Sequence, residues 1–326
     1  MSENYLQLAY MMKATSKPTR ALALMLGLFF SGTAFAQPAV RAEVDVPDAW
    51  RYNAGVQYTG ANFKSSISRK SAPETGLTFD ADNAQMGGVG GRLSRSVVNY
   101  NNGNPKLTQT NQHLSGRMYQ RNNTSGGRII YRLDYLHVDN TDSTRLTDDV
   151  KTWAPKIGLL TAEGNMFVDL EYAQSSYNGG LRVKQFAPSV GFAFNDSYDW
   201  INFKSYLIRN NIAARAMNNT SYNALAITWT HYFGQTNTQW MPASISVGVV
   251  LGSRMYAVDT TNGSISNLSH INRNGFNVGA NWKITRDTNF SFYAGSSTSR
   301  EPGLQAGSSN ISYRTTFANL GLSTAF

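Results

Sequence analysis

The sequence has no cysteine among its 326 residues, only 9 prolines, and no long apolar run after residue 36. The absence of cysteine excludes both a disulfide framework and a lipid-modified cysteine anchor. A transmembrane helix needs about 18 or more consecutive apolar residues. No segment after residue 36 approaches that length and mean hydropathy is −0.35, so a helical membrane protein is excluded. A β-barrel remains open, because its strands present apolar side chains to lipid only at every second residue.

The first 36 residues have the three parts of a secretory signal peptide. Lys13, Lys17 and Arg20 precede an apolar run at 21–30, and an Ala-x-Ala sequence ends at Ala36. The run is too short for the roughly 20 apolar residues of a membrane span, and small residues at its exit favour cleavage. We therefore predict a signal peptide over residues 1–36.

Cleavage after this peptide predicts a mature chain that begins at Gln37 and forms one domain over 37–326. Met11 or Met12 would give a more ordinary start than Met1. The peptide contains three basic residues and one acidic residue, so its removal leaves +7 of the net charge of +9. In an exported protein this charge favours anionic lipid, lipopolysaccharide or anionic solutes as partners, and argues against nucleic acid.

Apolar and polar residues alternate along most of the mature chain, which indicates β-strands. At 50–58, Trp50, Tyr52 and Tyr58 share one face. The opposite faces are rich in Gly, Ser, Thr, Asn and charge, as in a water-filled lumen. Tryptophans near predicted strand ends fit the aromatic girdles of membrane barrels. The pattern predicts an all-β, transmembrane, antiparallel up-and-down β-barrel. The other clear runs lie at 129–135, 166–172, 188–194, 225–233, 245–251 and 276–284, and the tryptophans are Trp50, Trp153, Trp200 and Trp282.

Short and long connections alternate, which predicts a barrel with turns at one end and loops at the other. From residue 84 onward this register gives twelve strands, and the segment 50–62 makes thirteen. Bacterial single-chain barrels have even counts. We therefore predict fourteen strands, with 40–46 as the missing one, and keep twelve as the alternative. The short turns are predicted at 122–127, 162–165, 195–198 and 286–289, and the loops at 99–111, 139–150, 210–219, 258–272 and 299–309.

The C-terminal segment ends in Phe326, with Leu320 and Leu322 at alternate positions before it. It resembles the closing strand of Gram-negative outer-membrane β-barrels of the porin-like superfamily, although Thr324 occupies a position that is usually more apolar. The resemblance implies insertion into the outer membrane by the barrel-assembly machinery, which reads this strand. It identifies the superfamily and no individual family.

Many basic residues fall on the predicted lumen face, opposed by only Asp134, Asp169 and Glu171. Such an excess would give the lumen a positive potential and favour anions. The alternative is that these side chains pair with carboxylates and loop carbonyls and brace the barrel. The densest patch, formed by residues 117, 121, 128 and 132, predicts a constriction. The candidate pore-lining residues are Arg51, Arg92, Arg117, Arg121, Arg128, Arg132, Lys156, Lys204, Arg254 and Lys283.

These features favour a channel for passive diffusion of small polar solutes, anions among them. The alternative is a structural barrel that binds lipopolysaccharide or a secreted polymer, as in polysaccharide export or secretion. Its candidate basic loop residues are Arg69, Lys70, Lys151, Arg182, Lys184 and Arg215.

Enzyme hypotheses have weaker support, and we expect no enzyme. His113 and Ser115 have the His-x-Ser spacing of outer-membrane phospholipases, but lack the Asn-Gly that follows in that family and are predicted to face inward. A surface protease of the omptin kind needs acids matched to a histidine at the barrel rim. Zinc motifs, phosphate loops and calcium-binding clusters are absent from the sequence, so we predict neither a metal nor a cofactor. The acids considered for the protease are loop acids for which the sequence offers no matched histidine: Asp139, Asp142, Asp148 and Asp149.

Overall fold

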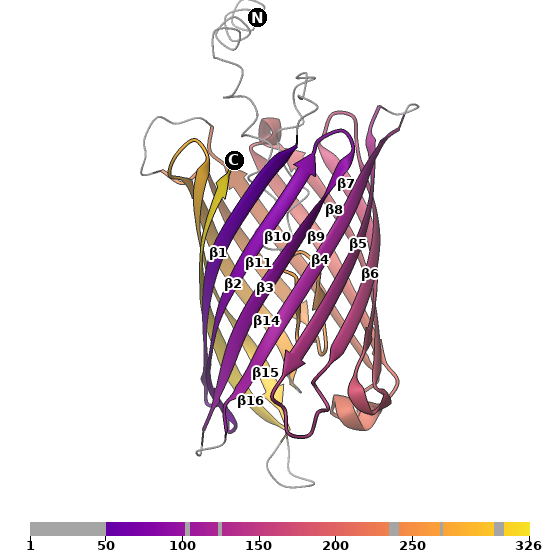
Figure 1. Cartoon of the computed structure of the whole chain (residues 1–326), viewed down its shortest axis with the longest axis vertical. Helices are drawn as coiled ribbons and strands as arrows, with labels where there is room; N and C mark the ends of the chain where they lie inside the picture. The colour runs from indigo at the N-terminus through magenta and orange to yellow at the C-terminus, as the bar shows by residue number, and fades with distance from the viewer. Residues whose placement is uncertain (1–49, 102–104, 123–125, 235–240, 268–269, 303–309) are drawn as a thin grey trace, which may run out of the picture.

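The computed structural model describes residues 50–101, 105–122, 126–234, 241–267, 270–302 and 310–326. Within these ranges fourteen antiparallel strands form one closed barrel, with β1 paired to β16 (Figure 1). The predictions of an all-β barrel and of fourteen strands are therefore confirmed. The described part of the chain has no helix long and apolar enough to cross a membrane.

The strands follow one another around the barrel in sequence order, and β12 and β13 form a separate two-stranded hairpin between β11 and β14. The strands are β1 Arg51–Lys64, β2 Arg69–Asn83, β3 Gly87–Tyr100, β4 Leu107–Arg121, β5 Arg128–Asn140, β6 Val150–Leu160, β7 Met166–Ser176, β8 Arg182–Phe194, β9 Asp199–Asn210, β10 Ser221–Tyr232, β11 Ser244–Gly252, β12 Val258–Asp259, β13 Ser264–Ile265, β14 Ile271–Lys283, β15 Thr288–Glu301 and β16 Ile311–Ala325. The described parts of the connections contain three short 3-10 helices: η4 Asn178–Gly180, η5 Asn195–Ser197 and η6 Ala213–Ala216.

The predicted alternation separates an apolar outer face from a polar inner one. Along β7, Val168 and Leu170 are exposed on the outside, while Asp169 and Glu171 are buried inside. One predicted girdle residue is wrong: Trp200 is 1% exposed, points inward and stacks on Phe167. Trp200 shares the inner face of β9 with Lys204, which was predicted to line the lumen, so its position near a strand end was misleading and the alternation was not.

The fourteenth strand is β2, which the sequence analysis missed. The segment proposed in its place, 40–46, lies outside the described residues. On its outer face β2 has only Leu77 and Phe79 as large apolar residues. Its inner face carries Glu74, Asp80 and Asp82. Too few apolar residues alternate in this strand for periodicity to reveal it, and the missed strand carries three carboxylates into the lumen.

The two ends of the barrel differ, as the predicted connections require. The turn end holds the C-terminus and the short connections at 84–86, 122–127, 161–165, 195–198 and 284–287. There Phe326 stacks on Tyr52 at 6.1 Å between ring centroids. The loop end holds the connections at 101–106, 141–149, 211–220, 253–270 and 302–310. The predicted turns and loops fall near these connections, but the alternation of lengths is incomplete, because the short connections at 65–68 and 177–181 join strands at the loop end and the longer one at 233–243 joins strands at the turn end.

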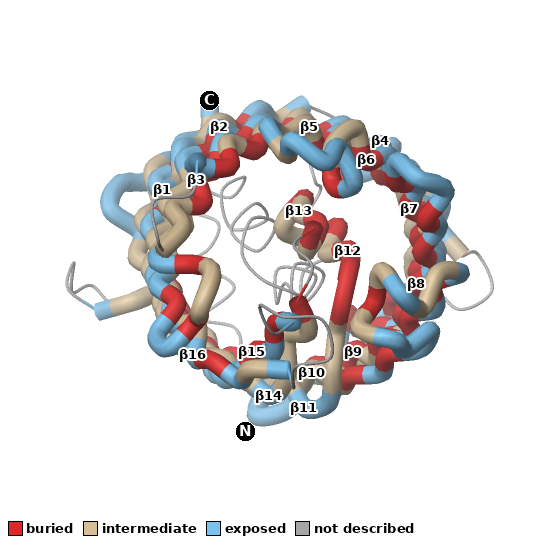
Figure 2. Tube along the Cα trace, turned by 90° about the horizontal axis from the view of Figure 1, so that it is seen from below, coloured by how far each residue is buried: buried red, intermediate tan, exposed pale blue. Residues whose placement is uncertain are grey.

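One connection folds into the barrel. Of the segment 253–270, which joins β11 to β14, the described residues carry the β12–β13 hairpin into the interior (Figure 2). Met255, Tyr256 and Val258 of this loop are each 1% exposed. They pack with inward side chains of β5–β10 such as Leu136 and Ile208. On the side formed by β5–β10, the half of the barrel interior nearest the loop end is therefore filled with apolar side chains. We name residues 253–270 the inner loop.

Candidate functional site: the lumen

Polar side chains of the barrel wall hold the tip of the inner loop. Arg132 Nη2 donates to the carbonyl of Thr260 at 2.9 Å, and Arg92 donates to the carbonyl of Asn262. Gln185 exchanges two hydrogen bonds with the backbone of Val258, at 2.8 and 3.0 Å. These contacts come from strands β3, β5 and β8, so the tip is fixed against the wall opposite its own origin at β11 and β14.

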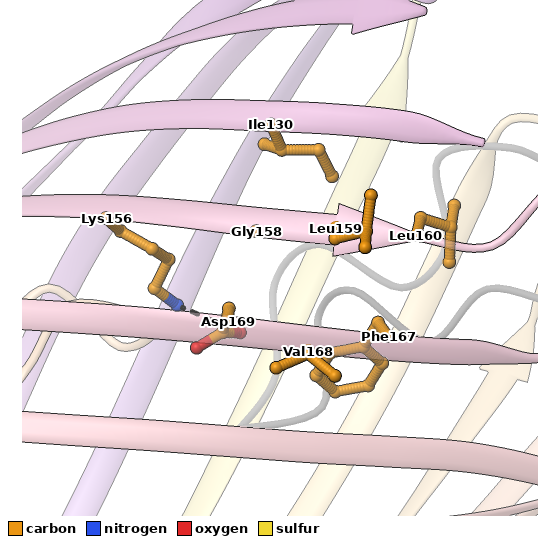
Figure 3. Close-up of a pocket in the computed structure, with 8 residues that line it drawn as sticks. All are labelled: Ile130, Lys156, Gly158, Leu159, Leu160, Phe167, Val168 and Asp169. Carbon is orange, nitrogen blue, oxygen red and sulfur yellow. Dashed lines mark ion pairs between the residues drawn. The ribbon is translucent and has the colours of Figure 1, made fainter. Parts of the chain in front are cut away.

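Glu171 forms the centre of an ion cluster beside the loop tip. Its carboxylate is fully buried and accepts a 2.6 Å hydrogen bond from Thr260 Oγ1. Lys156 Nζ and Lys204 Nζ lie 3.4 and 3.5 Å from it. Lys156 also lies 3.6 Å from Asp169, beside a small recess floored by Gly158 (Figure 3). Both predicted pore-lining lysines of this region therefore have carboxylate partners.

Three of the predicted arginines are paired as well. Arg117 binds Asp80 at 2.5 Å and Asp82 at 2.8 Å, so it neutralises part of the charge that β2 brings. Arg132 binds Asp134 at 2.7 Å, and Arg92 binds Glu74. The excess of lumen cations is therefore smaller than the sequence predicted, because the missed strand and the inner loop add carboxylates at Glu74, Asp80, Asp82 and Asp259 to the three expected. The bracing alternative holds for these arginines.

Four predicted pore-lining cations lie at the turn end, and none is within ion-pair distance of a carboxylate in the described part of the chain. Arg121 and Arg128 face each other across β4 and β5. Arg128 lies 5.0 Å from the centroid of the Tyr119 ring. Arg51 begins β1, and Lys283 ends β14. The tenth candidate, Arg254, lies in the inner loop with its guanidinium 4.9 Å from the centroid of the Tyr206 ring.

The wall formed by β14, β15, β16 and β1 differs from the packed side. Its inward residues are mostly small or polar, and many remain partly accessible to solvent, whereas the inward residues of β6–β9 are buried. A recess of about 60 Å³ lies on the other side of the loop tip, against β2–β5, where Thr78, Arg132 and Asn262 line it, and Gln57 of β1 is its one lining residue from the more accessible wall. The partly accessible inward residues are Gly55, Gln57, Thr59, Ala61, Gly275, Asn277, Asn281, Gly295, Ser297, Thr315, Phe317 and Asn319.

The candidate phospholipase pair faces inward, as predicted. His113 Nε2 lies 2.7 Å from Asp134 Oδ1, and Ser115 Oγ donates a long bond of 3.4 Å to the carbonyl of Gly90. A Cβ added to Gly263 of the inner loop would lie 2.5 Å from His113 Nδ1, so the loop covers the ring. The imidazole is therefore held between a carboxylate and the loop rather than hydrogen-bonded to the serine.

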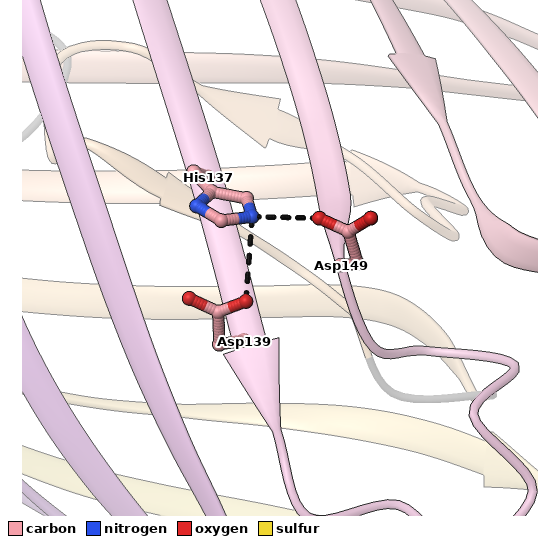
Figure 4. A group of neighbouring side chains, drawn as sticks. All are labelled: His137, Asp139 and Asp149. Atoms are coloured by element: carbon pink, nitrogen blue, oxygen red, sulfur yellow. Dashed lines mark hydrogen bonds and ion pairs between the residues drawn. The ribbon is translucent and has the colours of Figure 1, made fainter.

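A second histidine does meet acids, contrary to the sequence analysis, which left the loop acids without a matched histidine. His137 Nε2 lies 2.9 Å from Asp149 and 3.3 Å from Asp139 on the outer face near the loop end (Figure 4). The three ligand atoms lie within 4.8 Å of one another and could hold a cation, although Lys151 competes for Asp149 at 3.0 Å. The hydrogen bonds from His137 and Lys151 lower the pKa of Asp149.

The closed fourteen-strand barrel with a folded-in loop is the fold of outer-membrane β-barrels. Among solved structures, the chain is similar to the Pseudomonas putida toluene transporter TodX, with a TM-score of 0.50, 10% identity, and coverage of 94% of this chain and 97% of that one. It is also similar to a deltaS2 mutant of the TodX monoaromatic hydrocarbon channel, with a TM-score of 0.52, 10% identity, and coverage of 96% and 99%. No family model matches the chain, and no curated protein matches it in sequence. At this identity the likeness concerns the fold alone.

Proposed function

We propose that this protein is a non-enzymatic outer-membrane channel through which small polar solutes diffuse passively. The observation that carries the proposal is the asymmetry of the lumen. The inner loop is fixed against β3–β8, and the inward residues of β14–β16 and β1 stay partly accessible. Hydroxyl, amide and glycine backbone groups on that wall suit hydrated solutes.

The orientation follows from the connections. Outer-membrane barrels have short periplasmic turns and longer extracellular loops. The turn end would then face the periplasm, and the loop end the outside. Export by the predicted signal peptide and recognition of Leu320, Leu322 and Phe326 by the assembly machinery complete this proposal.

The proposed charge preference now rests on the periplasmic mouth rather than on the whole lumen. Around the loop tip each of the five cations has a carboxylate partner and the carboxylates outnumber them, so that region does not supply a positive potential. At the turn end, Arg121 and Arg128 lie directly opposite each other, and neither has a carboxylate of the described residues within ion-pair distance. Two like charges in direct opposition attract anions to the mouth. We therefore propose a moderate anion preference set at this position.

Conductance in planar bilayers tests both parts. The purified barrel should conduct, and its reversal potential under a salt gradient should show chloride preferred to potassium. Arg121→Gln with Arg128→Gln should reduce that preference. Lys184→Gln, on the outer face, is the matched control and should not change it. A barrel that never conducts contradicts the channel, and a preference for cations contradicts the selectivity.

A further inference from the structure

Exposed basic side chains on the outer face of the strands are confined to the loop end. They lie on β1, β3, β6, β8, β9, β15 and β16, whereas in the described strands the turn-end third of the outer face carries no lysine or arginine. The location of these cations matters, because an anionic layer around the loop end of the barrel would compensate their positive charge. The residues include Lys64, Arg95, Lys151, Arg182, Lys184, Arg209, Arg300 and Arg314.

Two pairs among these cations lie directly opposite each other in the sheet. Lys184 of β8 pairs with Arg209 of β9, and Lys64 of β1 pairs with Arg314 of β16. Directly opposed side chains have Cβ atoms about 5 Å apart, and like charges there destabilise the sheet. All four side chains are exposed, and none has a carboxylate of the described residues within ion-pair distance.

Each pair has a third cation close by. Arg300 pairs with Ser312, two residues along β16 from Arg314, so it is a diagonal neighbour of Arg314. Arg182 lies two residues along β8 from Lys184. Two separate groups of three cations, each built on a direct like-charge pair, therefore occupy the outer face.

The position of the first group fits a lipid headgroup. Phe186 and Leu207 are exposed on the outer face, two residues below Lys184 and Arg209. At about 3.3 Å per residue, the cations lie about 7 Å above these apolar side chains along the strands. A molecule bound there has acyl chains against the apolar face and anionic oxygens between the cations. Phosphate has the charge and the acceptor oxygens to bridge two cations.

We infer that the pairs Lys184–Arg209 and Lys64–Arg314 are two binding sites for the phosphate groups of an outer-leaflet lipid. The inference rests on the proposed membrane location but not on conduction, because the sites lie outside the barrel. Of the basic residues predicted for this partner from the sequence, the inference keeps Lys184 and Arg182, which lie on β8 rather than in a loop, and leaves out Arg69 and Arg215. Arg69 is buried against His270 and Tyr313, and Arg215 donates to backbone carbonyls in the loops.

Binding of purified bisphosphorylated lipid A to the detergent-solubilised barrel, followed by native mass spectrometry, tests the inference. Each cation near an anionic lipid surface contributes about fivefold to binding, so Lys184→Gln with Arg209→Gln should weaken the first site about 25-fold. The same exchange at Lys64 and Arg314 should act on the second site. Lys151→Gln is the matched control, since Lys151 is exposed at the same level but paired with Asp149.

Dephosphorylated lipid A should bind weakly to the wild type, and inorganic phosphate at equal concentration should not displace the lipid. Unchanged binding in the folded double variants, or equal binding of the dephosphorylated lipid, overturns the inference. Displacement by inorganic phosphate also overturns it, because the site would then recognise a free anion. Heat modifiability on electrophoresis establishes that each variant is a folded barrel.

Discussion

The hydrogen bond between the inner loop and the ion cluster allows a sharp test of how the lumen is narrowed. Thr260 Oγ1 donates to Glu171 at 2.6 Å, inside a fully buried site. Thr260→Val keeps the shape of the side chain and removes the donor. A hydrogen bond to a charged group contributes about 1.5–3 kcal/mol. With about 1.4 kcal/mol for each factor of ten, a loss near 2 kcal/mol raises the population of the displaced loop roughly thirtyfold.

The loop should remain mostly in place, because Arg92, Arg132 and Gln185 still hold it. Single-channel recordings should therefore show the main conductance of the wild type with brief larger openings that are about thirtyfold more frequent. Amide exchange at residues 258–265 should accelerate by the same factor, which gives a readout that does not require conduction.

Thr261→Val is the matched control, since the same change is made one residue away, where the side-chain hydroxyl forms no hydrogen bond in the described structure. Thr260→Ser should restore wild-type behaviour because it keeps the donor. Equal opening frequencies and exchange rates in Thr260→Val and the wild type would refute the assignment of this contact. Equal increases in both valine variants would also refute it.

Three further predictions concern stability and assembly. Arg117→Ala leaves two aspartates without their partner and should cost about 3–5 kcal/mol, seen as a lower unfolding temperature in detergent; a change below about 0.5 kcal/mol would contradict the pairing. The pKa of Asp149 is lowered in the folded protein, so its contact with His137 contributes fully to stability above the unfolded carboxyl pKa of about 3.9. This contribution is lost as the pH falls through the pKa of Asp149 in the folded protein. The difference in unfolding temperature between wild type and Asp149→Asn should therefore be present at neutral pH and vanish near pH 2; a constant difference would contradict it. Phe326→Ala should strongly reduce assembly in cells but barely change the stability of refolded barrel, because the side chain is 77% exposed; equal yields in cells would contradict the assembly role.

The sequence predicted the barrel because alternation is a local property of each strand. Runs such as 50–58 and 276–284 place large apolar residues at every second position, and burial of one face fixes their register. The strand β2 escaped because Leu77 and Phe79 are its only large outward residues. That omission also made the lumen look far more positive than it is, since the carboxylates of β2 were assigned to no strand.

The inner loop could not be predicted from periodicity. Its contacts with Arg132, Glu171 and Gln185 span more than 70 residues of sequence and depend on barrel closure. The sequence did show inward arginines. It could not show whether each would face water or a loop carbonyl, because that depends on where the polar loop folds.

Because the inner loop packs against β5–β10, the barrel has one densely packed side and one side with little packed behind its strands. One half resembles the interior of a soluble protein, with apolar side chains such as Leu136 and Ile208 around a buried ion cluster. The other, from β14 to β1, is a single layer of strands with little behind it. Because consecutive hairpins make up the packed half, that half can fold early, and the remaining strands can then pair onto it. The seam between β1 and β16 would then close last and yield first to heat or mechanical force.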